Sequence, residues 1–179
     1  GFTISGGAAD YGAGLRVQSS RLMLRHCSLA GNAASAQGGG VYTSVANLTV
    51  DDLTIGFNSA PLADAGVLNQ NNLNLLGPLY VTTGTVQVFS SFFDGPGRID
   101  LARQATLQVT GAAVGAPATV IRSNVTGTGT ISIDAGQQLL ITHGAVVDLS
   151  GNLGGGCADP AQAANWGRIE VNGQLLVRD

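Results

Sequence analysis

The sequence predicts an all-β protein that folds as a right-handed parallel β-helix, with about three short strands in each coil. Three observations predict this fold: a repeat of 26 residues, apolar residues that alternate within each repeat, and a composition poor in helix formers. Only 11% of the 179 residues are charged, Lys is absent and Glu occurs once, whereas Gly occurs 27 times. This composition is typical of short strands that are joined by tight turns.

The repeat occupies residues 15–66 and consists of two copies that begin at Leu15 and Val41. Equivalent positions in the two copies are separated by the same spacing throughout. The anchors pair Leu15 with Val41, Leu22 with Leu48, Cys27 with Leu53, Leu29 with Ile55, Asn32 with Asn58 and Gly40 with Gly66. Because repeats of this length stack on their neighbours to bury a shared core, we expect each anchor to lie over its partner.

Each copy contains two alternating segments that are separated by a predicted corner. Leu22 and Leu24 alternate as inward-facing strand residues do, two residues interrupt the pattern, and Cys27 and Leu29 resume it. A run of glycines, 38–40, precedes the next strand and supplies the positive φ that a tight corner requires. The pattern therefore predicts about three strands and three turns in each coil.

The remainder of the chain continues the repeat less regularly. Residues 1–14 match the end of a preceding coil, since Phe2 and Ile4 correspond to Cys27 and Leu29 at an offset one residue short of the repeat. After Gly66 we expect Val67 to open the next strand. The ladder then continues at Leu73 and Leu75 with one residue deleted.

A second style of repeat begins at Gly97, with further copies at Gly129 and Gly167, and we expect these three copies to stack on one another. We interpret residues 1–179 as one continuous β-helix domain and as a fragment of a longer chain. In this interpretation, residues 1–84 form the regular coils of the repeat, and residues 85–179 form coils with longer loop insertions.

The segment Gly31-Asn32-Ala33, followed by Gly38-Gly39-Gly40, resembles the repeats of polymorphic outer-membrane proteins and related secreted bacterial β-helix proteins. The second copy keeps Asn58 but has Asp64-Ala65-Gly66 in place of the triple glycine. The C-terminal half, at 127–131 and 147–151, is similar to autotransporter-passenger and pectate-lyase-like sequences. The resemblance implies a secreted or cell-surface protein in a superfamily that hosts adhesins, structural shafts and polysaccharide enzymes.

The predicted corners carry the most informative polar residues. Arg25-His26 and Asp51-Asp52 occupy equivalent positions, so we expect Arg25 to lie over Asp51 and His26 over Asp52, about 4.8 Å apart. The structural interpretation is a solvated corner with favourable ion pairs, each worth about 0–1 kcal/mol. The functional alternative is a carbohydrate-cleaving site, in which two carboxyl groups act on a glycosidic bond.

The motifs of pectin-cleaving β-helix hydrolases are incomplete in this chain. Where those enzymes carry Gly-His-Gly and Arg-Ile-Lys, this sequence has Thr142-His143-Gly144 and Arg98-Ile99-Asp100. A lyase requires a calcium-binding cluster of acids, whereas the acids here are scattered. The candidate catalytic residues are therefore limited to Arg25, His26, Asp51 and Asp52, and we expect no cofactor or metal.

Two further features allow alternative interpretations. Cys27 is expected to be a small buried apolar residue, and a bridge to Cys157 would require the distant glycine-rich loop to fold back. The pair Phe92-Phe93 fits either core filling or an exposed platform for a ligand. The formal charge of −3 and the scattered arginines do not indicate a nucleic-acid partner, and no apolar stretch is long enough to span a membrane.

The sequence therefore favours a structural or adhesive segment of a secreted or cell-surface protein, without catalysis. We expect self-association through open β-helix ends, which can pair with another chain, and a glycan or a host-cell surface as the external ligand. The alternative is a β-helix that binds or cleaves carbohydrate through the face that carries Asp51 and Asp52.

Overall fold

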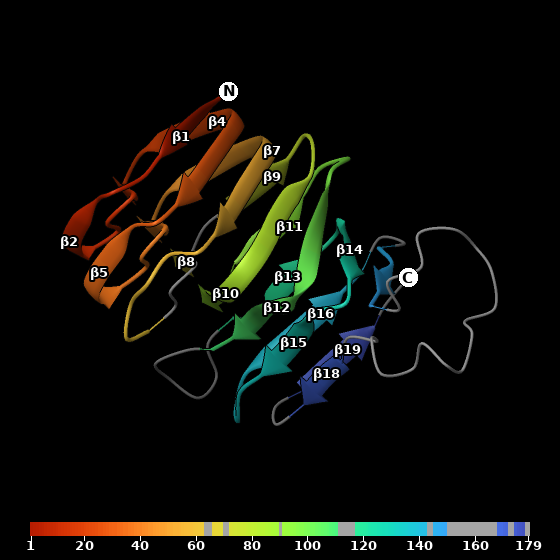
Figure 1. The fold of residues 1–179 in the computed structure, drawn as a ribbon. Coiled ribbons are helices and arrows are strands. Elements are labelled where there is room, and N and C mark those ends of the chain that lie inside the picture. The colour runs from red at the N-terminus through yellow and green to blue at the C-terminus, as the bar shows by residue number, and fades with distance from the viewer. Residues whose placement is uncertain are drawn as a thin grey trace, which may run out of the picture.

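The fold is a parallel β-helix, as the sequence predicts. The computed structural model describes residues 1–62, 66–69, 72–89, 91–110, 117–142, 145–149, 168–171 and 174–177. These residues form strands and turns and contain no helix. Every strand pairing among them is parallel. Successive coils lie side by side, from β1 at one end of the stack to β18 and β19 at the other (Figure 1).

The strands are β1 (Phe2–Ile4), β2 (Ala8–Tyr11), β3 (Leu15–Gln18), β4 (Arg21–Ala30), β5 (Ala33–Gln37), β6 (Val41–Ser44), β7 (Asn47–Gly56), β8 (Gly66–Asn69), β9 (Asn72–Leu75), β10 (Leu79–Phe89), β11 (Phe92–Asp94), β12 (Arg98–Val109), β13 (Thr119–Ile121), β14 (Asn124–Gly127), β15 (Thr130–Ile133), β16 (Gln138–Ile141), β17 (Val147–Asp148), β18 (Arg168–Val171) and β19 (Gln174–Val177). Several long strands bend, so that their two halves lie in different faces of the β-helix.

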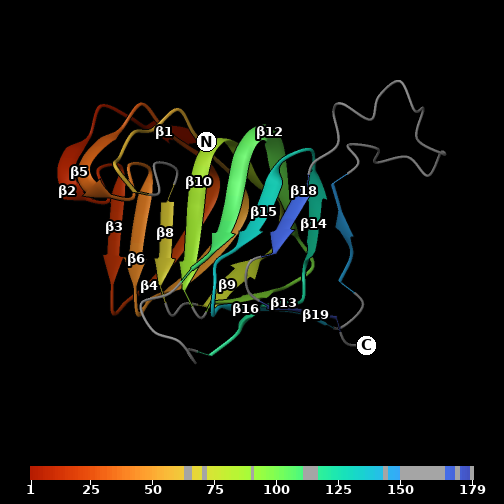
Figure 2. The ribbon, with the colours of Figure 1, turned by 90° about the horizontal axis from the view of Figure 1, so that it is seen from below.

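The strands form three faces. Face A contains β1, the second halves of β4 and β7, the first halves of β10 and β12, and then β14 and β17. Face B contains β3, β6, β8, the second halves of β10 and β12, β15 and β18, several of which appear side by side in Figure 2. Face C contains the first halves of β4 and β7, and then β9, β11, β13, β16 and β19. Each coil therefore contributes one straight segment to each face.

The register of the N-terminal coils confirms the predicted repeat. Leu22 lies beside Leu48, Cys27 beside Leu53 and Leu29 beside Ile55. Phe2 pairs with Cys27, which confirms that the offset of the first coil is one residue shorter. Cys27, Leu29, Leu48, Leu53 and Ile55 share one core, with Leu22 packed against it, whereas Phe2 at the end of the stack is 59% exposed.

The corners are formed by single residues in the left-handed conformation. His26 (φ 49°) and Asp52 (φ 60°) bend β4 and β7 at the predicted break, and Gly31 (φ 68°) and Phe57 (φ 54°) form the next corner. Ser19 and Val45 form a third pair of this kind, at equivalent positions of the two copies. A left-handed residue between two extended segments turns the chain sharply, and non-glycine residues adopt it at a cost of about 1–2 kcal/mol.

The glycine anchor at the end of the repeat was predicted wrongly. Gly66 pairs with Val41 and not with Gly40, and Val67 consequently lies beside Tyr42. The deletion falls between two bridges, since Ser59 still pairs with Ala33 at the full repeat, whereas Leu62 pairs with Gln37 and is one residue short of it. A Cβ atom on residue 66 would lie 2.7 Å from Cγ1 of Val41, so a larger residue here would have to displace the Val41 side chain.

The predicted stacking of the second style of repeat is only partly correct. The strand that follows Gly97 pairs with β14, whereas the strand that follows Gly129 pairs with the second half of β12, so that Ile131 lies beside Leu107 and not beside Ile99. The relation between Gly129 and the last copy is confirmed, since Ile131 pairs with Ile169. All three faces have the same alternating pattern, so the pattern alone could not distinguish one face from another.

The change of period has a structural cause. The early coils contain an extra segment between faces A and B, formed by β2, β5 and residues 59–62. In the next coil β10 passes from face A to face B at Gly84 (φ 86°) without this segment. Leu79 accordingly pairs with Leu53, a full repeat earlier in the chain, but its partner in the following coil, Ile99, comes after a shorter interval.

The core is a single column of aliphatic side chains with few aromatic ones. Leu29, Leu53 and Phe93 are fully buried within it. Cys27 is buried at 5% exposure and is a free cysteine, which confirms its expected role as a small core residue. Two residues that were named from the sequence, His143 and Cys157, lie outside the described residues.

Candidate functional site

The structure brings together the four candidate residues at the corner between faces C and A. Nε of Arg25 lies 3.1 Å from Oδ2 of Asp51, and Nδ1 of His26 lies 3.0 Å from Oδ2 of Asp52. Both pairs join equivalent positions of neighbouring coils, as the repeat predicts. The side chains point outward because their neighbours Leu24 and Cys27 occupy the core.

The corner pairs are solvent-exposed. The Arg25 and Asp51 side chains are 59% and 25% exposed, and those of His26 and Asp52 are 64% and 47% exposed. Exposed ion pairs of this kind contribute about 0–1 kcal/mol each. The geometry therefore agrees with the structural interpretation of the corner, and each carboxylate is already paired with a cationic or imidazole side chain.

A hollow of about 250 Å³ lies against this corner. Its lining includes His26, Ser28, Asp52 and Thr54, together with residues 1–3. Asp52 orients the imidazole through Nδ1, which is the arrangement that positions a histidine for proton transfer. Cys27 also borders the hollow, but its thiol donates to the carbonyl oxygen of Arg25 over 2.8 Å.

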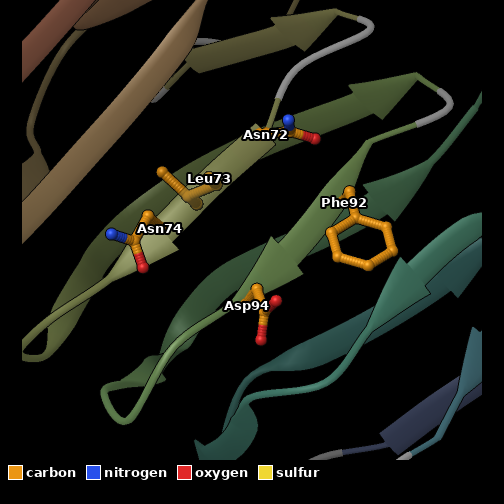
Figure 3. Close-up of a pocket in the computed structure, with 5 residues that line it drawn as sticks. All are labelled: Asn72, Leu73, Asn74, Phe92 and Asp94. Atoms are coloured by element: carbon orange, nitrogen blue, oxygen red, sulfur yellow. The ribbon is translucent and has the colours of Figure 1, made fainter.

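A second site lies on the outer side of face C, between β9 and β11. Asn72 and Asn74 point outward on β9, since they alternate with buried Leu73, and Phe92 and Asp94 occupy the paired positions on β11. Figure 3 shows the two asparagines at successive outward positions of β9, with Phe92 and Asp94 opposite them. We call this feature the face C groove; it has a volume of about 330 Å³.

Arg122, from the following coil, completes the edge of the face C groove. Its guanidinium carbon lies 4.4 Å from the centroid of the Phe92 ring, and Nη1 lies 3.9 Å from Oδ2 of Asp94. Nε of Arg122 is buried and has no hydrogen-bond partner within the part of the chain that the structure describes. Oδ1 of Asp94 accepts a hydrogen bond from the backbone N–H of Gly95 over 2.8 Å, which fixes the orientation of the carboxylate.

The two phenylalanines have different environments. Phe93 is fully buried in the core, which confirms core filling for that residue. Phe92 faces outward, is partly exposed and lines the face C groove. Core filling therefore applies to Phe93 and the exposed position to Phe92, because neighbouring residues of a strand point to opposite sides.

Four residues of this site were not predicted from the sequence: Asn72, Asn74, Asp94 and Arg122. A signal was present, because Asn72-Leu73-Asn74 and Phe92-Phe93-Asp94 share a pattern in which a buried residue separates two outward ones. The two segments are separated by less than one repeat, so a search at the repeat period does not align them. Arg122 follows Asp94 at a different spacing again, so the repeat period does not align these two residues either.

Face A carries a third polar cluster. Nε of Arg98 lies 2.9 Å from Oδ2 of Asp100, and the Thr126 hydroxyl of the next coil donates to Oδ1 of the same carboxylate. Asp100 thus stands at the place where the incomplete Arg-Ile-Lys motif lacks its second basic residue. Its carboxylate has an arginine and a threonine as partners, so we interpret this cluster as one that stabilises the fold.

Among the described residues, no group of three or more His, Cys, Asp or Glu side chains is placed to hold a metal ion. No helix of the described chain is long and apolar enough to cross a membrane.

Comparisons with known proteins found no relative: no family model matches the sequence, and neither the curated proteins nor the solved structures contain a significant match.

Proposed function

We propose that this chain is a structural or adhesive segment of a secreted or cell-surface protein, in which the β-helix displays polar side chains in fixed rows. The observation that supports this proposal is the continuous register of outward-facing residues along the stack. Arg25 lies beside Asp51 on one corner, and Asn72 lies beside Phe92 on face C. Rows of this kind give a ligand or a surface a rigid array of contacts.

The physics of stacking supports a scaffold role. Each coil buries its core against the coils on either side and continues their hydrogen bonds, so stability depends on neighbours and not on surface residues. Surface substitutions away from special features usually change stability by less than about 0.5 kcal/mol. The outward rows are therefore free to take residues that suit a ligand.

The proposed location rests on the sequence resemblance to polymorphic outer-membrane proteins and autotransporter passengers. Asn32, which the resembling segment contains, is buried at 1% exposure and hydrogen-bonds to the coils on both sides. An asparagine at this position of each repeat is therefore useful to any β-helix with the same corner. Placement in the pectate-lyase-like superfamily belongs to the same proposal.

Self-association of copies is also part of the proposal. Within the described residues, β3 pairs with β6 on one side, and a hollow of about 460 Å³ is lined in part by Leu15, Val17 and Leu22. Leu15 and Leu22 are partly buried against the core and Val17 is 6% exposed, and an open strand edge beside them can pair with another chain.

The test is adhesion of the folded chain. We expect the purified protein to bind an array of glycans or the surface of intact cells, and the heat-unfolded protein to lose that binding. Absence of binding to every surface would contradict the adhesive function. Analytical ultracentrifugation over a range of concentrations tests association, and a monomer at every concentration would exclude it.

Carbohydrate cleavage is the second candidate, favoured by the adjacent carboxylates Asp51 and Asp52 at the corner, of which Asp52 lines an open hollow. The measurement is the release of reducing ends from polysaccharides by the wild type and by the double variant Asp51→Asn/Asp52→Asn. Cleavage that depends on both carboxylates would support this candidate. Lack of release by the wild type, or equal release by the variant, would exclude it.

A further inference from the structure

We propose that the face C groove, lined by Asn72, Asn74, Phe92 and Asp94, binds a neutral pyranose unit of a glycan. This inference rests on the proposed adhesive function, and it names the ligand class and the site. It is independent of the corner residues Asp51 and Asp52.

The dimensions of the groove fit a sugar ring. Its volume of about 330 Å³ lies at the lower end of the range for small-molecule sites, about 300–1,000 Å³. The outward residues Asn72 and Asn74 are two positions apart, about 7 Å along the strand, and β11 lies about 4.8 Å to the side. The four side chains therefore surround an area comparable to one ring and its substituents.

The apolar contact is Phe92. The C–H groups on one side of a pyranose form an apolar patch that packs against an aromatic ring, which is polarised with a negative face. The guanidinium of Arg122 lies over the same ring, with its carbon 4.4 Å from the centroid. This contact restricts the motion of the Phe92 side chain, so less entropy is lost when a ligand packs beside it.

The polar contacts match hydroxyl groups, which both donate and accept hydrogen bonds. The exposed amides of Asn72 and Asn74 supply donors and acceptors, and the carboxylate of Asp94 accepts. Oδ1 of Asp94 is held by the N–H of Gly95, so the carboxylate is already oriented before a ligand arrives. Hydroxyls at neighbouring ring positions can engage an amide and the carboxylate at the same time.

The charge of the groove favours a neutral sugar over an acidic one. Asp94 is 57% exposed at the groove and repels an anionic ligand. Arg122, the cation at the edge, already packs on Phe92 and faces Asp94, with 34% of its side chain exposed. A uronic acid would therefore face the exposed carboxylate of Asp94 first.

The backbone at the groove argues against a peptide ligand. β9 pairs with β7 and β11, and β11 pairs with β9 and β13, so neither strand offers a free edge for an added strand. Peptides that bind sheets most often use such an edge. Recognition at the face C groove depends on side chains, as it does for sugars.

The test is titration calorimetry of the full chain with cellohexaose, mannohexaose and β-1,4-galactohexaose, and with hexagalacturonate as the anionic comparison. We expect at least one neutral hexasaccharide to bind more tightly than hexagalacturonate. Phe92→Leu, which keeps an apolar side chain, should weaken that binding about tenfold, and Phe92→Tyr should retain it. The matched control is Phe57→Leu, since Phe57 is 72% exposed and lies outside the groove.

A second pair of variants keeps the test valid if Phe92→Leu does not fold. Asn72→Ala changes an exposed residue of the groove, and Asn47→Ala changes the residue beside it in the preceding coil, outside the groove. We expect weaker binding for the first variant alone. Binding of no neutral hexasaccharide, equal losses in the control variants, or tighter binding of hexagalacturonate would each overturn the inference.

The outcomes separate this inference from the adhesive function. If the wild type and Phe92→Leu adhere equally well to the same surface and bind hexasaccharides equally well, the site assignment is wrong and adhesion stands. If the wild type binds a neutral hexasaccharide through Phe92 but adheres to no surface, the site is correct and the adhesive function is wrong.

Discussion

The side-chain amide of Asn32 donates a hydrogen bond to Oδ1 of Asn58, its equivalent in the next coil, over 3.0 Å. The same oxygen of Asn58 also accepts from the backbone N–H of Asn32 over 3.1 Å. Oδ1 of Asn32 in turn accepts from the N–H of Gly7, one coil earlier. The two asparagines thus link three successive coils at one corner, next to backbone hydrogen bonds such as the one from the N–H of Ser59 to the carbonyl oxygen of Asn32.

Replacing Asn32 by alanine should lower the free energy of unfolding by about 3 kcal/mol. The residue is 1% exposed, and its loss leaves the N–H of Gly7 and the carbonyl of Ile4 without this partner. Each buried polar group left unpaired costs about 1–3 kcal/mol. Urea unfolding measures the change, with Asn47→Ala at an exposed position as the control; equal effects of the two substitutions would contradict the prediction.

Two substitutions at left-handed corners should change the free energy of unfolding in opposite directions. Gly31→Ala should lower the free energy of unfolding by about 1–2 kcal/mol, because φ is 68° there although a Cβ atom would meet no other atom within 4 Å. Val45→Asn should raise it by about 1 kcal/mol, because Val45 has a φ of 51° and is 59% exposed, and asparagine tolerates this conformation better. Thermal unfolding of both variants gives the measurement, and a shift of the same sign in both would refute the conformational explanation.

The ion pair between Arg25 and Asp51 should contribute little to stability. We expect a double-mutant cycle with Arg25→Ala and Asp51→Ala to give a coupling energy below about 1 kcal/mol, because 59% of the arginine side chain is exposed. Salt at about 1 M should reduce this coupling further, since it shortens the Debye length to about 3 Å and screens exposed charges that are farther apart than that. A coupling above about 2 kcal/mol that is insensitive to salt would show that the corner is more important than its exposure suggests.

Substitutions at inward and outward residues of the same coils should differ strongly in their effect on the free energy of unfolding. Leu53→Ala should lower the free energy of unfolding by about 2–5 kcal/mol, because Leu53 is fully buried between Cys27 and Leu79 in the adjacent coils. Met23→Ala, at an outward position with 47% exposure, should change it by less than about 0.5 kcal/mol. Similar values for the two variants, measured by urea unfolding, would be incompatible with the observed register.

The sequence by itself determined the architecture and the register of the regular coils. The fixed spacing of the repeat places Leu22 beside Leu48 and Arg25 beside Asp51, because in a parallel stack the neighbour of a residue is the residue one coil away. The corner at His26 was also readable, since two residues interrupt the alternation there. These features are local or strictly periodic, so they need no knowledge of the remaining chain.

Only the tertiary structure decided the register of the later coils and the composition of the face C groove. An alternating strand fits any of the three faces equally well, so the length of each turn decides that Ile131 packs beside Leu107 and not beside Ile99. The segment between faces A and B ends before β10, which shortens the coil and brings Phe92 beside Asn72. Side-chain proximity across coils of unequal length depends on the sum of all turns between them, and no local pattern in the sequence records that sum.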